Sequence, residues 1–177
     1  MNIAHVCTPH GFGHLTRQLA LGQALETLSV SSTYYCHNAS IVKESHPHAK
    51  YIIKSADLGL VQKDSLHINI EQTQKKLYEL CCEEQIEWWA QELSPYDGVI
   101  ADLPPVILEA CRRIKKPVLA VGNFDWAWIY RHYPALKDWS KLFFRWQEGH
   151  DAIALSPGPK LEGFNILKTL VPSSENS

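Results

Sequence analysis

The chain has 177 residues, of which 45% are hydrophobic and 20% are charged, and its formal net charge at pH 7 is −2. This balance is typical of one globular domain with a single buried core, and the length leaves little room for a second domain. Because the 17 Lys and Arg do not outnumber the 19 Asp and Glu, no bulk positive field is available to hold a phosphate backbone or an anionic lipid surface. We therefore expect no nucleic-acid partner.

No segment predicts secretion or membrane anchoring. The N-terminus reaches a Gly/His turn after about seven apolar-biased residues, without the basic start or cleavage site of a signal peptide, and no run approaches the ~20 apolar residues that cross a bilayer. The cysteines are odd in number and lack CxxC spacing, which argues against a disulfide framework and a structural zinc site. We expect a cytoplasmic protein with no transmembrane segment, no metal and free thiols at Cys7, Cys36, Cys81, Cys82 and Cys111.

The chain opens on the pattern strand, turn, helix. Residues 2–8 are β-prone and end at Pro9 in a glycine-bearing turn. Residues 15–28 then carry apolar side chains at helical spacing, among them Leu15 and Leu28. This arrangement predicts a first strand whose carboxyl end leads directly into a helix.

Two further strands and a long helix are predicted next. Residues 31–37 and 50–55 have the composition of short strands, and the segment between them is long enough for one brief helix. Residues 65–93 are rich in Glu, Gln and Lys, with apolar residues such as Leu77 and Trp88 at spacings of three, four and seven. This pattern predicts one long amphipathic helix.

The second half continues the alternation of strands and helices. Residues 97–102 predict a buried strand, 104–116 a helix that starts on two prolines and ends on basic residues, and 117–124 another strand. A Trp-rich, helical stretch runs on to about Gly149, and residues 152–155 predict a short strand.

Continuous apolar strands separated by helices predict a parallel sheet covered on both faces, which is a doubly wound, Rossmann-like α/β domain of roughly five to seven strands. In such sheets ligands bind at the carboxyl ends of the strands. The loops that begin at Thr8, Ala101 and Gly122 are therefore where we expect the functional residues.

The first of these loops places two glycines between two histidines, His10 and His14. Gly11 and Gly13 permit a tight turn with exposed backbone N–H groups, and the following helix presents its positive end, so a polar or anionic ligand can approach closely. One alternative is a plain strand-to-helix turn. Another is a dinucleotide fingerprint, although Thr16 stands where its third glycine belongs.

His14 and Asp102 are the candidate catalytic pair. At a helix N-terminus the dipole disfavours the imidazolium, which keeps a neutral nitrogen available as a general base. Asp102, at the end of a strand on the same rim of the sheet, can hold the other ring N–H and stabilise the imidazolium that forms. The alternatives are that Asp102 is the N-cap of the next helix and that His14 bonds only to backbone.

The third loop places Asn123 and Asp125 beside Phe124 and Trp126. Aromatic faces next to amides and carboxylates suit a sugar ring, whose axial CH groups stack while its hydroxyls take polar partners. The alternative is that the rings belong to the core of the following helix. The nine histidines show no metal-ligand spacing.

Taken together, these segments resemble the N-terminal half of GT-B glycosyltransferases. The likeness is carried by the HGFGH turn and by residues 59–66, 96–130 and 152–159, in that order, and it spans nearly the whole chain. It is strongest to the glycosyltransferase-like domain fused to sugar kinases in L-arabinokinases, and more distant to MurG and to plant UDP-glycosyltransferases that act on small molecules.

The resemblance implies roles for individual residues. In inverting GT-B enzymes a histidine of the first Gly-rich loop removes the proton of the acceptor hydroxyl, and an aspartate after a later strand orients it; the matching positions are His14 and Asp102. It also implies an acceptor pocket formed by the first and third loops. The residues expected to bind substrate there are His10, Gly11, Phe12, Gly13, Asn123, Phe124, Asp125 and Trp126.

The resemblance further implies that residues 1–171 form the acceptor-side domain and that 172–177 are a disordered tail or the start of an interdomain linker. The nucleotide-sugar donor would bind a missing C-terminal domain or a partner chain, with no other cofactor, and the acceptor would be a sugar or glycoside. The isolated chain is then expected to be inactive. The alternative is a non-catalytic sugar-binding or regulatory module, like that fused to sugar kinases.

Overall fold

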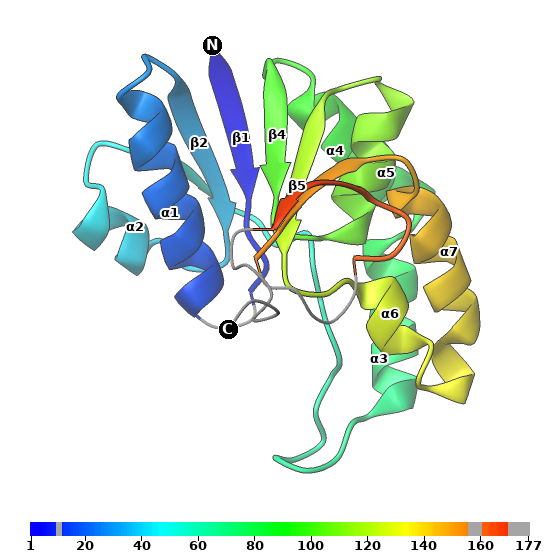
Figure 1. The fold of residues 1–177 in the computed structure, drawn as a ribbon. Coiled ribbons are helices and arrows are strands. Elements are labelled where there is room, and N and C mark those ends of the chain that lie inside the picture. Colours follow the sequence, from blue (N-terminus) through cyan, green and yellow to red (C-terminus); the bar gives the residue numbers. More distant parts are fainter. Residues whose placement is uncertain (10–11, 156–160, 170–177) are drawn as a thin grey trace, which may run out of the picture.

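The computed structural model describes residues 1–9, 12–155 and 161–169, and its centre is a seven-stranded sheet in which every strand pairing is parallel (Figure 1). The doubly wound α/β fold expected from the sequence is confirmed. The strands are β1 (Asn2–Val6), β2 (Ser31–Cys36), β3 (Lys50–Ile53), β4 (Gly98–Ala101), β5 (Val118–Gly122), β6 (Asp151–Ala154) and β7 (Asn165–Thr169), in the sheet order β3-β2-β1-β4-β5-β6-β7.

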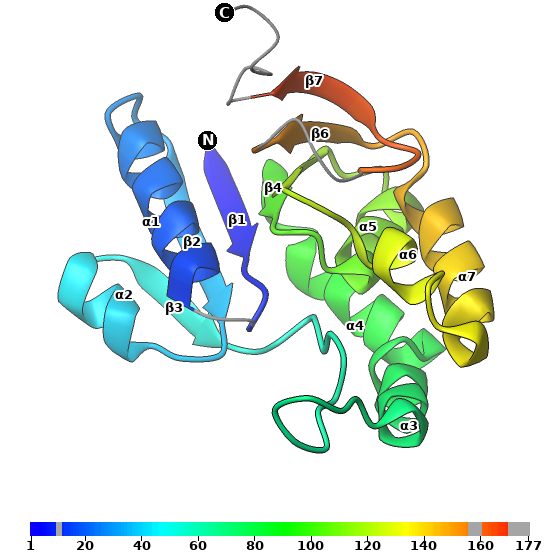
Figure 2. The same cartoon turned by 60° about the horizontal axis from the view of Figure 1, so that its bottom comes forward.

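The helices form two layers, one on each face of the sheet (Figure 2). Helices α1 and α2 pack on one face, and the larger group, α3 to α7, packs on the other. Parallel neighbours need crossover connections, and helices supply those between β1 and β2, β2 and β3, β4 and β5, and β5 and β6. The helices are α1 (Phe12–Glu26), α2 (Ser40–Ser45), α3 (Ile70–Leu80), α4 (Glu83–Leu93), α5 (Pro105–Arg113), α6 (Trp126–Tyr130) and α7 (Lys137–Gln147), with a 3₁₀ turn at Pro134–Leu136.

The two faces of the sheet are visible in the adjacent residues Tyr34 and Tyr35 of β2, both fully buried. Because successive side chains of a strand point to opposite faces, Tyr34 packs in the cluster with Leu15 and Leu19 of α1. Tyr35 belongs to the larger cluster on the other face, with its ring 5.4 Å from that of Trp89 in α4. The sheet is thus buried on both sides, as its apolar strands predict.

The prediction of a single helix over residues 65–93 is wrong. Residues 65–69 lie in the loop that precedes α3, and the chain leaves helical geometry at Cys81 and Cys82, where Cys82 is extended and forms the N-cap of α4. The break lets each short helix bury its own face: α3 buries Leu77, and α4 buries Trp89. The predicted Trp88 is instead 36% exposed.

Other differences lie at element ends. The first helix stops at Glu26, so Leu28, expected on its apolar face, is 72% exposed. The Trp-rich helical stretch is divided into α6 and α7, because Pro134 cannot continue a helix and starts a 3₁₀ turn instead. Strand β7 was not expected from the sequence.

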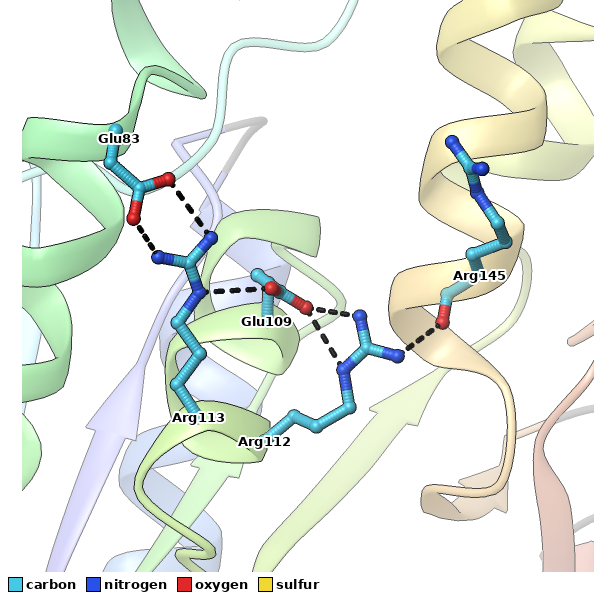
Figure 3. A network of polar contacts seen from close by, with 5 residues as sticks. All are labelled: Glu83, Glu109, Arg112, Arg113 and Arg145. Carbon is cyan, nitrogen blue, oxygen red and sulfur yellow. Dashed lines mark hydrogen bonds and ion pairs between the residues drawn. The ribbon is translucent and has the colours of Figure 1, made fainter.

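A polar network joins three helices on one face (Figure 3). Glu109 of α5 is 8% exposed and accepts hydrogen bonds from the Nε atoms of Arg112 and Arg113, both 2.9 Å long. Arg113 reaches across to Glu83 of α4, with Nη2 3.0 Å from Oε2, and Arg112 Nη1 donates to the backbone carbonyl of Arg145 in α7 at 2.9 Å. The network therefore fixes α4, α5 and α7 relative to one another.

The strand order reverses between β1 and β4, which lie side by side in the middle of the sheet. From β1 the chain winds outward to β2 and β3, and from β4 it winds the other way to β7. At such a point the loops leaving the two strands diverge and open a crevice at their carboxyl ends. Those ends carry the arrowheads that point toward the bottom of Figure 1.

Candidate functional site

A cavity of about 190 Å³ lies at this crevice. It is lined by the loops after β1, β3, β4 and β5 and by the first turns of α1, so four strand ends contribute. Its apolar wall is formed by Leu103, Phe124 and Trp126. Its polar side chains are Thr8, His14, Arg17, Asp57, Asp102 and Asn123, and the backbones of Gly13 and Gly122 complete it.

The chain delivers His14 and Asp102 to this cavity by two different turns. His14 is the third residue of α1, so it lies at the positive end of that helix, as expected. Asp102 directly follows β4, and Leu103 then takes a positive φ of 59°, which turns the chain toward α5. The N-cap of α5 is Pro104, so the alternative in which Asp102 caps this helix is wrong.

His14, Asp102 and Arg17 meet at one carboxylate oxygen. Nδ1 of His14 lies 2.9 Å from Oδ2 of Asp102, and Nη2 of Arg17 lies 2.6 Å from the same oxygen. Nη2 is also 3.0 Å from Nδ1. The Asp102 side chain is only 2% exposed, whereas those of His14 and Arg17 are 27% exposed. A buried carboxylate is therefore held by two partners that also reach the cavity.

These contacts favour one tautomer of neutral His14. If Nδ1 carries the proton, both His14 and Arg17 donate to Oδ2, and every short contact with the carboxylate is a hydrogen bond. If Nδ1 is bare, it accepts from Nη2 of Arg17 at 3.0 Å, but its lone pair also faces the charged carboxylate at 2.9 Å, which is repulsive. The favoured tautomer leaves Nε2 as an acceptor, which is the form that a general base requires.

The residues expected from the third loop divide into two groups. Asn123, Phe124 and Trp126 line the cavity. Asp125 does not, because its Oδ1 caps α6 by accepting from the backbone N–H of Trp128 at 2.7 Å and its Oδ2 accepts from the N–H of Glu162 at 2.9 Å. Burial raises the pKa of Asp125, and these N–H donors oppose the rise. Its carboxylate is thus committed to holding the loop.

The residues expected from the first loop are described only in part. Gly13 lines the cavity, and Phe12 begins α1. His10 and Gly11 lie outside the described residues.

Three polar residues of the cavity, Thr8, Arg17 and Asp57, were not named as site residues from the sequence. Asp57 follows the third strand, so the rule that directs attention to strand ends applies to it as well. Arg17 stands three residues after His14, a spacing that puts both on one helix face. Thr8 was recognised only as the start of the first loop.

Among residues 1–9, 12–155 and 161–169, no group of three or more His, Cys, Asp or Glu side chains could hold a metal ion. Within the same ranges, no helix has both the length and the apolar character needed to span a bilayer.

The sheet of this chain has the architecture of one half of a known fold. This seven-stranded parallel sheet, with the strand order 3-2-1-4-5-6-7, is that of one Rossmann-like half of the GT-B glycosyltransferase fold. No protein-family model matches the sequence, and no curated protein matches it. The assignment of the fold therefore rests on solved structures.

Two GT-B glycosyltransferases illustrate the likeness. MurG of Acinetobacter baumannii superposes with a TM-score of 0.53 at 12% sequence identity, over 96% of this chain and 44% of MurG. UGT73P12 of Glycyrrhiza uralensis, complexed with glycyrrhetinic acid 3-O-monoglucuronide, gives a TM-score of 0.54 at 13% identity, over 88% of this chain and 44% of that structure. This chain spans less than half the length of either, and at such identities the likeness establishes the fold alone.

Proposed function

We propose that this chain is the acceptor-binding half of an inverting glycosyltransferase that uses a nucleotide-sugar donor, with His14 as the general base. One observation carries the proposal: the 2.9 Å contact between Nδ1 of His14 and the buried carboxylate of Asp102, inside a cavity at the carboxyl ends of the strands. The GT-B half-fold supports it, because the resemblance that implies these two roles is to half of the same fold.

The residues act in sequence on the acceptor. Nε2 of His14 accepts the proton of an acceptor hydroxyl as that oxygen forms a bond to the anomeric carbon of the donor sugar. The bond between this carbon and the diphosphate breaks, and its electron pair leaves with the nucleoside diphosphate. Asp102 holds the Nδ1–H and stabilises the imidazolium until the proton is released.

The acceptor binds between the polar and apolar walls of the cavity. Phe124 and Trp126 offer ring surface, and Asn123 offers an amide that can both donate and accept. Asp125 supports this pocket indirectly, by fixing the loop that carries the three residues.

In this proposal residues 1–171 supply only the acceptor side. A second Rossmann-like domain or a partner chain holds the diphosphate of the donor and stabilises its departure. The length of the structures that share this half-fold supports this, because the matched part is only 44% of each.

The proposal is tested by a double-mutant cycle in the enzyme assembled with its donor half, identified by co-purification with this chain. His14→Ala should lower kcat by a factor of roughly 10²–10⁴, the usual loss for a general base, with little change in acceptor binding. Asp102→Asn should lower kcat through the same step. Because the two residues act as a unit, the double variant should be scarcely worse than His14→Ala alone.

A matched control is His67→Ala, since His67 is a 72% exposed histidine paired with an aspartate, Asp64, in the loop before α3. It should keep full activity. Strictly additive losses for His14 and Asp102, or a His14→Ala enzyme as active as the control, would contradict the assignment.

A further inference from the structure

Asp57, in the loop between β3 and α3, joins the walls of the cavity. It is 7% exposed, and its Oδ2 accepts hydrogen bonds from Oγ1 of Thr8 at 2.6 Å and from Nε1 of Trp126 at 2.8 Å. Its Oδ1 accepts from the backbone N–H groups of Leu58 at 2.7 Å and Gly59 at 3.4 Å. One carboxylate thus ties together the loops that follow β1, β3 and β5.

A second hydrogen bond joins the loop of Asp57 to α6, the helix that begins at Trp126. The Tyr130 hydroxyl donates to the carbonyl of Gly59 at 2.6 Å. The Tyr130 ring lies 5.6 Å from that of Trp126, and the Phe124 ring lies 5.9 Å from it and nearly perpendicular to it. The Trp126 indole is therefore held at its N–H by Asp57 and packs against two further rings.

Only a carboxylate fits the described surroundings of Asp57. The four groups named above all donate hydrogen, two to each oxygen. An Asn amide would have to point its NH₂ group at one of these pairs of donors, so it could satisfy only the other. The carboxylate is thus engaged by the protein, and Thr8 and Trp126 are the cavity residues through which it can position a ligand.

We infer that Asp57 is a positioning residue for the acceptor and that the acceptor is a neutral, single-ring sugar, an inference that rests on the proposed function. Asp57 holds the Trp126 indole as an apolar wall and turns the Thr8 hydroxyl so that its lone pairs face outward as acceptors for a sugar hydroxyl. An aromatic wall beside a hydroxyl acceptor suits a pyranose ring, which has both apolar faces and hydroxyls.

The size and charge of the cavity set the class of acceptor. A volume of about 190 Å³ is close to the ~150 Å³ that accommodates a benzene molecule, so it has room for about one six-membered ring. Two buried carboxylates, Asp57 and Asp102, line it against one guanidinium, that of Arg17. The carboxylates outnumber the cation, so the side chains disfavour an anionic ligand even though the N-terminus of α1 lies at the same cavity, and they do not disfavour a neutral pyranoside.

Calorimetry of the purified chain against a panel of neutral methyl pyranosides tests the inference. At least one should bind the wild-type protein, and Asp57→Asn should weaken its binding at least tenfold. Asp138→Asn is the matched control, because Asp138 is a 96% exposed carboxylate outside the cavity, and it should bind as the wild type does. In the assembled enzyme, Asp57→Asn should raise the acceptor KM and change kcat less than threefold.

The indole N–H supplies a readout that does not depend on the ligand. Of the six tryptophan indole signals in a ¹H–¹⁵N spectrum, that of Trp126, assigned by its loss in Trp126→Phe, should exchange slowly with solvent in the wild type and fast in Asp57→Asn. Trp126→Phe keeps an aromatic ring but lacks the donor, so it should weaken pyranoside binding at least threefold even if Asp57→Asn does not fold.

The outcomes separate this inference from the proposed function. The positioning role would be overturned if pyranoside affinity were unchanged in Asp57→Asn or in Trp126→Phe. It would also be overturned if the indole N–H exchanged equally fast in the wild type and in Asp57→Asn. A wild-type chain that binds no pyranoside would overturn the acceptor class. Transfer that depends on His14 but uses another kind of acceptor would leave the proposed function standing.

Discussion

Asp102, which follows β4, and His5, which lies in β1, are both buried ionisable residues, but their surroundings differ in charge. Asp102 has Arg17 and His14 on its carboxylate, so its charge is compensated within the protein. His5 of β1 is fully buried, and its ring nitrogens contact the neutral side chains of Gln18 at 2.9 Å and Ser32 at 3.1 Å. Burial therefore lowers the pKa of His5, and the Gln18 bond opposes this only in part.

This lowered pKa predicts a loss of stability in acid. Below about pH 6.5 the unfolded chain binds a proton at His5 that the folded chain does not, so the free energy of unfolding should fall as the pH drops until the folded residue protonates too. Urea unfolding between pH 7.5 and 5 measures the slope. His5→Gln should flatten it, whatever its effect on stability at pH 7.5.

Part of the slope should remain in that variant, because burial also lowers the pKa of His150. The exposed His48 provides the control, and His48→Gln should have the slope of the wild type. A His5→Gln protein with an unchanged slope would show that His5 is not the source.

At this scale the sequence predicted that Asp102 contacts His14, but not what Asp57 and Asp125 contact. All three carboxylates follow strands, and only the folded chain shows that Asp125 faces two backbone N–H groups and that Asp57 joins Thr8 to Trp126. The rotation of a loop decides this, and no local spacing encodes it. The catalytic role of His14 and the likeness to the arabinokinase domain stay predictions.

Among the helices, α1 depends on a glycine to approach the sheet. A Cβ atom at Gly22 would overlap the hydroxyl of Tyr34 in β2 and come within 2.8 Å of its Cζ. The close approach of α1 to the sheet, which also carries His14 and Arg17, thus needs the absence of a side chain at this position.

Gly22→Ala should therefore destabilise the protein by about 1–3 kcal/mol, the range for overpacking, even though Ala is the better helix former by about 1 kcal/mol. Thermal unfolding measures the change. Removing the hydroxyl in Gly22→Ala/Tyr34→Phe should recover part of the loss, and a double variant less stable than Gly22→Ala would argue that the clash is not the cause.

The network in Figure 3 gives a second prediction for the helices. Glu109→Gln removes the negative charge that Arg112 and Arg113 share, and it should lower the free energy of unfolding by about 1–2 kcal/mol. This loss is smaller than for a fully buried ion pair, because both arginines are partly exposed. Glu83→Gln, at a 63% exposed carboxylate, should have a smaller effect. Equal losses for the two variants in urea unfolding would show that burial of Glu109 adds nothing.

Helices and strands were predictable where the spacing of apolar residues was regular over the whole element. They were not predictable where tertiary contacts divide a regular segment into two helices. Nothing in the residues Cys81 and Cys82 breaks a helix, yet α3 and α4 separate there so that Tyr78 can pack 5.0 Å from Trp139 while Trp89 packs on Tyr35. Strand β7 has no clear pattern of its own and is added by pairing with β6.

For the whole molecule, the alternation of apolar strands with helices was sufficient to predict a doubly wound parallel sheet, and its winding places β1 and β4 together at the reversal of strand order. This topology explains why residues 88 positions apart, His14 and Asp102, meet at one rim. The account built on it is that this rim binds the acceptor and that the donor belongs to another domain or chain.

The rate of sugar transfer by the purified 177-residue chain, alone and with its co-purified donor half, tests that account most directly. With a panel of nucleotide sugars and methyl pyranosides, the chain alone should give no transfer above the uncatalysed rate, because in this account the groups that stabilise the leaving diphosphate belong to another domain or chain. Adding the donor half should give turnover that His14→Ala abolishes. Sustained turnover by the chain alone, or turnover by the assembly that is indifferent to His14, would contradict the account.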